Sequence, residues 1–90
     1  MTKLLFTRSA LNDLERLRGF IAEKNPTAAS NVAKRLLASI HKLQEHPKMG
    51  KAVAGIQNVR DWVVGDYVTR YQIKQDCIVI LRVWHDKEDR

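Results

Sequence analysis

The sequence predicts an α+β domain with the element order β-α-α-β-β-β, in which a helical hairpin packs on a small antiparallel sheet. Three observations lead to this fold class. Apolar residues recur at helical spacing over two segments in the first half of the chain, and Asn25-Pro26 separates these segments. After Gly55 the pattern changes to runs rich in β-branched and aromatic residues. Residues 1–90 have room for one hydrophobic core, so they are expected to form a single domain.

The first two predicted elements are a short strand and an amphipathic helix. Residues 3–6, KLLF, form the strand. Thr7 or Ser9 begins the helix, because either hydroxyl can accept a hydrogen bond from the unpaired N–H groups of the first turn. Its apolar residues recur at spacings of three and four and therefore form one stripe: Leu11, Leu14, Leu17 (or Arg18) and Ile21.

The second helix begins in the segment KNPTAAS, where Asn25 can cap it and Pro26 suits its first position. The helix ends at HPKMG, because Pro47 disfavours helix at the residue before it and Gly50 permits a turn. Since the link between the two helices is very short, they form an antiparallel hairpin. One face of this helix is apolar: Ala29, Val32, Ala33, Leu36, Ile40 and Leu43.

Three strands follow, over residues 59–64, 67–73 and 77–85. The pairs Gly65-Asp66 and Gln75-Asp76 separate them and are short enough for tight hairpins. The last strand starts with five apolar residues in succession, CIVIL. This pattern predicts a central strand that the helices cover on one side. Simple alternation places Arg82 on one face with Ile78, Ile80 and Trp84, and the other face carries Val79, Leu81, Val83 and His85.

The composition is that of an ordinary globular domain with an excess of positive charge. Hydrophobic residues make up 44% and charged residues 29% of the chain, and the formal net charge is +6. The stretch from Lys24 to Arg60, with both ends counted, contains seven basic residues and one acidic residue, Glu45. Such a surface attracts nucleic acid or an acidic protein, or it serves solubility alone. No apolar segment is long enough to span a membrane and none resembles a signal peptide, so we expect a cytoplasmic protein without a membrane partner.

The cysteine and histidine residues predict neither a disulfide framework nor a metal site. Cys77 is the single cysteine, and it is interpreted as a small core residue because it begins an apolar run. The three histidines, His41, His46 and His85, do not show zinc-ligand spacing with it. No cofactor is expected.

The element order and a set of residues along it resemble the RelE/ParE toxin superfamily of bacterial type II toxin–antitoxin systems, over nearly the whole chain. The resemblance implies a toxin that arrests growth, stabilises plasmids and is neutralised by a cognate antitoxin. It rests on the spacing from Asn25-Pro26 through His46-Pro47 to Arg60, Tyr67, Arg70-Tyr71 and the run Arg82-Val83-Trp84-His85.

Members of this superfamily differ in mechanism. RelE-like members resemble ribosome-dependent mRNA endoribonucleases, which need a base, an acid and cations around the scissile phosphate. ParE-like members resemble poisons of DNA gyrase, which act by binding. Here Val68 stands two residues before Arg70, where RelE-like proteins carry an arginine. The tail DKEDR, residues 86–90, has three acidic residues, which would repel a phosphate. These departures favour the ParE-like branch and a gyrase inhibitor with no catalytic residues.

Two alternatives remain open. In the first, the protein is a RelE-type enzyme in which His85 provides acid–base chemistry and Arg82 or Arg60 binds the phosphate. In the second, the fold retains only antitoxin binding and transcriptional co-repression.

Several residues are candidates for contact with a partner. Arg82 either pairs with Asp61 or Asp66, stacks on Trp62 or Trp84, or contacts the partner directly. For the others too, a structural role stands beside the functional one: strand pairing for Arg70, burial under the helices for Trp62, and a strand-end hydrogen bond for His85. The candidates for partner binding are Arg60, Trp62, Arg70, Arg82, Trp84 and His85, with Lys34 and Arg35 from the basic group that also includes Lys42, Lys48 and Lys51.

The resemblance also implies the kinds of partner. The antitoxin would combine a DNA-binding part with a partly disordered, acidic C-terminal segment. We expect that segment to lay apolar anchors over the helical hairpin and the sheet edge, with its acidic residues on the basic surface. DNA gyrase would be the target, and toxin and antitoxin could form a hetero-oligomer on operator DNA.

Overall fold

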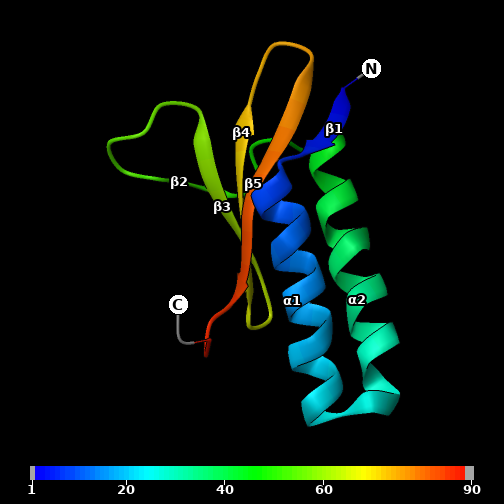
Figure 1. Cartoon of the computed structure of the whole chain (residues 1–90). Helices are drawn as coiled ribbons and strands as arrows, with labels where there is room; N and C mark the ends of the chain where they lie inside the picture. Colours follow the sequence, from blue (N-terminus) through cyan, green and yellow to red (C-terminus); the bar gives the residue numbers. More distant parts are fainter. Residues whose placement is uncertain (1, 89–90) are drawn as a thin grey trace.

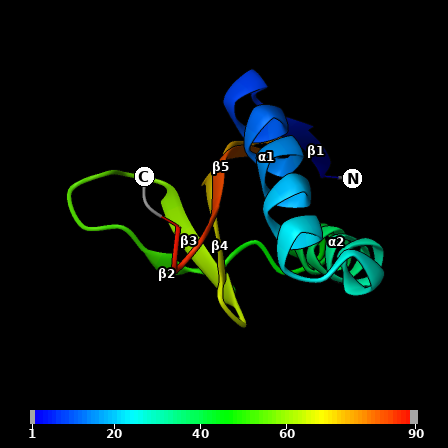
Figure 2. The same ribbon diagram turned by 60° about the horizontal axis from the view of Figure 1, so that its bottom comes forward.

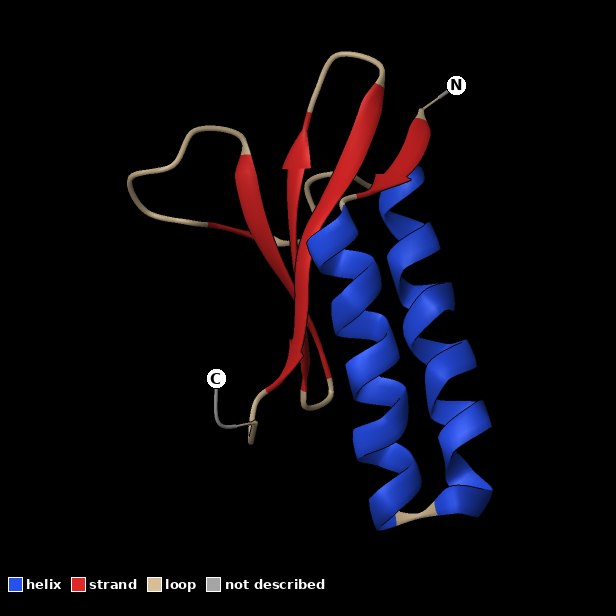
Figure 3. Cartoon of the chain, in the orientation of Figure 1, coloured by secondary structure: helices blue, strands red, loops and turns tan. Residues whose placement is uncertain are grey.

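The computed structural model describes residues 2–88, except for the side chain of Lys24. Two helices pack against one face of a five-stranded sheet with the strand order β1-β5-β4-β3-β2 (Figures 1 and 3). This confirms the predicted α+β class and the helical hairpin. The elements are β1 (Lys3–Phe6), α1 (Arg8–Lys24), α2 (Pro26–His41), a 3-10 turn η1 (Lys42–Gln44), β2 (Lys51–Ala52), β3 (Val59–Val64), β4 (Tyr67–Ile73) and β5 (Cys77–His85).

The sheet differs from the prediction in two respects. It is mixed rather than wholly antiparallel, because β1 runs parallel to β5 from the pair Lys3–Cys77 to the pair Phe6–Ile80. A parallel neighbour is possible here because the helical hairpin carries the chain away from β1 before the other strands form. The strand β2 was not predicted, since two residues, Lys51 and Ala52, are too few for a visible alternation.

Both helices begin where the sequence predicts. The Thr7 hydroxyl accepts the N–H of Ala10 at 3.0 Å and caps α1. The Asn25 side chain accepts the N–H of Ala28 at 3.1 Å and caps α2, with Pro26 in the first turn. Neither helix is long and apolar enough to span a membrane, as judged over residues 2–88.

The core lies between the helical hairpin and the sheet. Figure 2 shows the helices on one side of the strands, and within residues 2–88 no helix lies on the other side. We call this other side the open face. Tyr71 is completely buried on the covered side and is the largest buried side chain. The remaining core residues are Ala10 and Leu17 of α1, Leu36 and Ile40 of α2, Leu43 of η1, and Ile78, Ile80 and Val83 of β5.

A β-bulge in the central strand changes which residues of β5 share a face. Arg70 of β4 pairs with Arg82, but the next residue, Tyr71, pairs with Ile80, so that Leu81 is the extra residue. As a result Ile80 and Val83 both face the helices, and Arg82 does not lie on the face of Ile80. The predicted assignment of Arg82 to that face was wrong, because simple alternation does not allow for an inserted residue.

Beyond the bulge, helix α1 replaces β1 as the neighbour of β5. The strand β1 ends opposite Ile80, whose carbonyl accepts the N–H of Thr7 at 3.0 Å. The Thr7 hydroxyl donates to the carbonyl of Leu81 at 2.9 Å, and the Asp13 carboxylate accepts the N–H of Val83 at 2.9 Å. Side chains of the first helix therefore satisfy backbone groups that would otherwise lack partners along this edge.

Candidate partner-binding surfaces

Asp13 is the centre of an ionic cluster that joins α1 to β5. Its side chain is 2% exposed. Arg82 donates to it through Nε at 2.7 Å and Nη2 at 3.1 Å, and Arg16 donates through Nη1. The partner of Arg82 is thus Asp13, and neither Asp61 nor Asp66 as the sequence had indicated. Asp13 was not predicted as this partner, because the two residues lie 69 positions apart in the chain and no local pattern links them.

The environment of Asp13 keeps it ionised. Burial acts to raise the pKa of its carboxyl, but hydrogen bonds from Arg82, Arg16 and the N–H of Val83 outweigh this effect and lower the pKa to about 2. Asp13 is therefore a charged acceptor for the bulged strand at neutral pH. One clue was present in the sequence: Asp13 lies three residues after Ala10 and four before Leu17, on the face that α1 turns towards the sheet.

The described part of the acidic tail folds back on α1. The Glu88 carboxylate accepts from Arg16 Nε at 2.7 Å and from Arg16 Nη2 at 3.1 Å, and it also accepts the N–H of His85 at 2.8 Å. The hydrogen bond from Arg16 lowers the pKa of Glu88. Asp89 and Arg90, the last residues of the tail, lie outside the described residues. Glu88 is thus engaged with a cation of its own chain.

His85 is packed at the end of β5 between two aromatic rings. Its side chain is 12% exposed, and its ring centroid lies 5.2 Å from that of Phe20 and 4.9 Å from that of Tyr67. Its Nδ1 accepts the N–H of Lys87 at 3.0 Å, so this nitrogen carries no proton in that hydrogen bond. This contact is a strand-end hydrogen bond, the structural role named for His85 in the sequence analysis.

The three residues of the nuclease alternative do not converge. Arg60 of β3 pairs with Tyr71 of β4, whereas His85 pairs with Tyr67, four positions along the same strand. Four positions correspond to roughly 13 Å at the usual rise of a strand. Arg82 lies between these positions, on the other face of the sheet, with its guanidinium on the Asp13 carboxylate.

Arg60 and Trp62 lie on the face of β3 that the helices cover. There they bond the loop after η1 and helix α2, respectively. Arg60 Nη1 donates to the carbonyl of Gly50 at 2.6 Å, and Trp62 Nε1 donates to the carbonyl of Ser39 at 3.3 Å. Tyr71, on the next strand, has a framework role that was not predicted. Its hydroxyl donates to the carbonyl of Pro47 at 2.6 Å and accepts the N–H of Gly50 at 2.9 Å. These contacts fix the turn after η1 against the sheet.

Arg70 and Trp84 form a pair on the open face. The Arg70 guanidinium lies 5.3 Å from the centroid of the Trp84 ring. Asp61 holds it there, accepting from Nε at 2.8 Å and from Nη2 at 3.0 Å. The Arg70 side chain remains 36% exposed. Among the candidates for partner binding, the Arg70–Trp84 pair therefore has a fixed geometry, and its Arg70 side chain is accessible to a partner.

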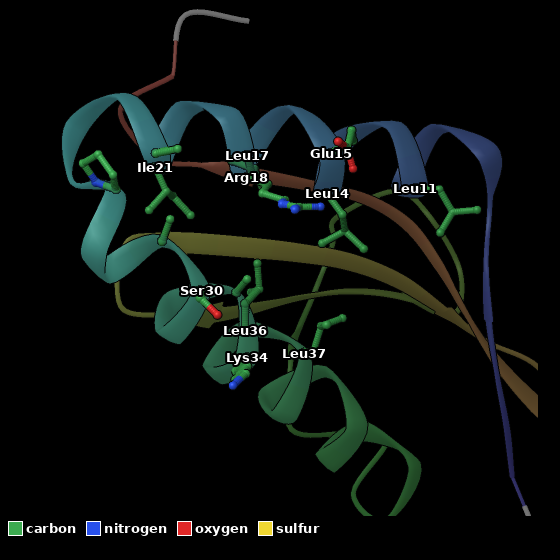
Figure 4. Close-up of a pocket in the computed structure, with 14 residues that line it drawn as sticks. Leu11, Leu14, Glu15, Leu17, Arg18, Ile21, Ser30, Lys34, Leu36 and Leu37 are labelled. Atoms are coloured by element: carbon green, nitrogen blue, oxygen red, sulfur yellow. The ribbon is translucent and has the colours of Figure 1, made fainter.

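A groove runs between α1 and α2 on the side of the hairpin away from the sheet (Figure 4). Its volume is about 630 Å³, and its lining includes Leu11 and Leu37, which are 54% and 39% exposed. Lys34 and Arg18 also line it, and Arg35 is exposed beside Lys34. The sequence predicted Leu11 as part of a packed stripe, but its spacing could not reveal that this part of the stripe faces a groove.

The described residues show no group of three or more histidine, cysteine, aspartate or glutamate side chains that could hold a metal ion. Two surfaces of the described residues are suited to binding a partner. One is the largely apolar groove on the helical side, which Arg18, Lys34 and Glu15 also line, and the other is the arginine–tryptophan pair on the open face.

The fold is that of proteins from toxin–antitoxin systems. Residues 4–90 match the family described as the ParE toxin of the type II toxin–antitoxin system parDE, and the chain belongs to this family.

A relative by sequence agrees with this assignment, and solved structures share the fold. The chain is 34% identical over 86 residues to Toxin RelE2 of Caulobacter vibrioides, covering 94% of this chain and 96% of that one. Among solved structures, the chromosomal ParDE system of P. aeruginosa gives a TM-score of 0.81 at 21% identity, with 94% of this chain and 96% of that chain covered. The RelB–RelE antitoxin–toxin complex of Methanococcus jannaschii gives 0.64 at 25% identity, with 92% and 91% covered.

Proposed function

We propose that this toxin arrests bacterial growth in the cytoplasm by binding DNA gyrase, without catalysing a reaction of its own. The observation that carries the proposal is that the three candidate catalytic residues do not converge and are engaged in structural contacts. The Nδ1 of His85 accepts a backbone N–H, Arg82 holds Asp13, and Arg60 holds the carbonyl of Gly50. A ribonuclease site would need a base and cations around one phosphate.

Two assays run in parallel test this proposal. Purified toxin is expected to inhibit the supercoiling of relaxed plasmid by gyrase, or to stabilise the gyrase–DNA cleavage complex. The same preparation is expected to leave mRNA on translating ribosomes uncut. Cleavage of that mRNA with no effect on gyrase would reject the gyrase proposal and favour the alternative.

A ribosome-dependent mRNA endoribonuclease is the second candidate, because the Caulobacter relatives carry RelE names.

A substitution at His85 distinguishes the two candidate functions. If the toxin acts by binding, the substitution His85→Ala should leave growth arrest unchanged once protein levels are matched. The loss of the ring contacts to Phe20 and Tyr67 should lower the free energy of unfolding by about 1–2 kcal/mol. Growth on inducing plates and chemical denaturation measure the two effects; His85→Phe, which keeps an aromatic ring, is the control for packing.

We further infer that the cognate antitoxin docks on the groove between α1 and α2. Its exposed leucines offer anchor sites for the apolar face of a helix, and Lys34 lies beside them. The excess of basic residues between Lys24 and Arg60 would attract an acidic segment. Antitoxin and toxin could then bind operator DNA together as a hetero-oligomer.

A single groove substitution tests this docking site. We expect Leu37→Glu to weaken antitoxin binding by at least about tenfold, because it removes an apolar anchor and adds a charge that repels an acidic segment. The matched control is Ala38→Glu, the same charge on the next residue, which is exposed and does not line the groove. Titration calorimetry with the product of the neighbouring reading frame measures both. Equal affinity for the two variants would place the antitoxin elsewhere.

A further inference from the structure

The open face of the sheet has the composition of a binding surface. Cys77 to Leu81 of β5 are apolar at every position, yet the helices cover only one side of this strand. Val63 on the open face is 58% exposed, and Leu5 of β1 is 48% exposed. β5 and β4 separate these two residues, but Val63 is level with the apolar residues Val68 and Trp84 on the next two strands. Contiguous apolar surface of this kind marks interaction sites.

The strand register arranges this face in two rows. Val63, Val68 and Trp84 lie opposite one another across β3, β4 and β5 and form an apolar row. Asp61, Arg70 and Arg82 form a charged row beside it. Tryptophan and arginine are the residue types that contribute most to protein–protein binding, and here the Arg70–Trp84 contact is already formed. A preformed pair loses little side-chain freedom when a partner binds.

The charges on this face favour a protein over a nucleic acid. The Asp61 carboxylate, at the β3 end of the charged row, is 25% exposed and would repel phosphates. Arg70 uses its Nε and Nη2 on Asp61, and a guanidinium has five N–H donors, so others remain for a carboxylate or carbonyl of a partner protein.

The same charges distinguish the open face from the antitoxin groove. Arg18, Lys34 and one carboxylate, Glu15, line the groove, and Arg35 is exposed next to Lys34 on α2. An acidic antitoxin segment is drawn to that side. On the open face, Arg70 and Arg82 each already hold a carboxylate of this chain. The two surfaces also lie on opposite sides of the molecule, because the groove is on the side of the hairpin away from the sheet (Figure 4).

We propose that the open face is the surface on which this toxin docks its target protein, while the antitoxin takes the groove on the opposite side. The inference rests on the proposed function in one respect, that the toxin acts by binding a protein. The partner surface it fits is apolar with a carboxylate or carbonyl aimed at Arg70.

The test separates the two surfaces with one substitution on each. Val63→Glu puts a charge in the apolar row at a position exposed enough to tolerate it, and Leu37→Glu puts the same charge in the groove. We expect Val63→Glu to raise the toxin concentration for half-inhibition of gyrase supercoiling by at least about tenfold and to relieve growth arrest. Its affinity for the product of the neighbouring reading frame should stay within about threefold of wild type. Leu37→Glu should bind the product of the neighbouring reading frame more weakly and leave gyrase inhibition unchanged. The control Val63→Ile keeps an apolar side chain and should retain wild-type toxicity.

Three results would overturn the proposal. Undiminished toxicity of folded Val63→Glu would mean that the target does not use this face. Loss of antitoxin binding in the same variant would assign the face to the antitoxin. A wild-type dimer that Val63→Glu converts to a monomer, with toxicity unchanged, would assign it to a second copy of this chain. If wild-type toxin arrests growth but spares gyrase, the gyrase proposal fails, and growth arrest by the variants still tests the surface.

Discussion

Replacing Asp13 by alanine is expected to lower the free energy of unfolding by about 3 kcal/mol, the larger of two strong effects. The substitution leaves the buried N–H of Val83 without an acceptor and deprives Arg82 and Arg16 of their shared carboxylate. Both arginines are partly exposed, so water can solvate them, and this keeps the loss below that of a fully buried ion pair. Urea denaturation followed by circular dichroism measures the change.

Asp61→Ala is the matched control, because Asp61 also holds an arginine but is 25% exposed. We expect this control to lose about 1 kcal/mol or less, as exposed ion pairs do. Equal losses for the two variants would show that the bulged strand does not depend on Asp13.

The ionisation of Asp13 also predicts how stability varies with pH. Its pKa in the folded protein is about 2, against an ordinary value of 3.8, so the folded state binds this proton less tightly than the unfolded chain. The resulting stabilisation is fully present above about pH 4 and is lost as the pH falls through about 2. It amounts to about 2 kcal/mol. Asp13→Asn should therefore show a shallower loss of stability between pH 4 and pH 2 than wild type.

Gly50→Ala is the second strongly destabilising change, with an expected loss of about 2–3 kcal/mol. A Cβ at this position would lie 2.7 Å from the Tyr71 hydroxyl oxygen and 2.9 Å from the carbonyl oxygen of Asp61. Tyr71 is fully buried and its hydroxyl is hydrogen-bonded to Pro47, so it cannot move away without loss. Thermal unfolding of the purified variant measures the effect.

Gly19→Ala provides the control for Gly50→Ala. Gly19 is exposed within α1, and a Cβ there would meet no atom within 4 Å. Alanine has a higher helix propensity than glycine, so the free energy of unfolding of this variant should rise by about 0.5–1 kcal/mol. A loss at both glycines would contradict the steric explanation.

Much of the fold could be predicted because its signals are local. The Asn25 cap, Pro26 and the two-residue turn at Gly65 each act within a few residues. The bulge at Leu81 could not be predicted, since it arises from the register between two strands rather than from the pattern of one. The same limit hid the parallel pairing of β1 with β5.

The candidate surfaces were predicted less well, for a related reason. Residue types drew attention to Arg82, but its partner Asp13 is 69 positions away in the chain. The requirement for Gly50 is also non-local, because the atoms that exclude a side chain there belong to Tyr71 and Asp61. Composition identifies cations and aromatic residues, whereas their accessibility depends on contacts that only the folded chain provides.

The pairing of β1 with β5 has a consequence for how fast the toxin folds. Lys3 must find Cys77, which is 74 residues away, before the β1 edge of the sheet is complete. Closing so long a loop costs chain entropy that later contacts must offset, and domains with many such distant pairs fold in milliseconds to seconds. We therefore expect every newly made chain to pass through an interval in which the α1–α2 hairpin and the strands β3 to β5 can form while the edge of β5 that β1 covers is still unpaired. An unpaired strand edge can pair with another chain, so this interval is when the new toxin is most exposed to aggregation.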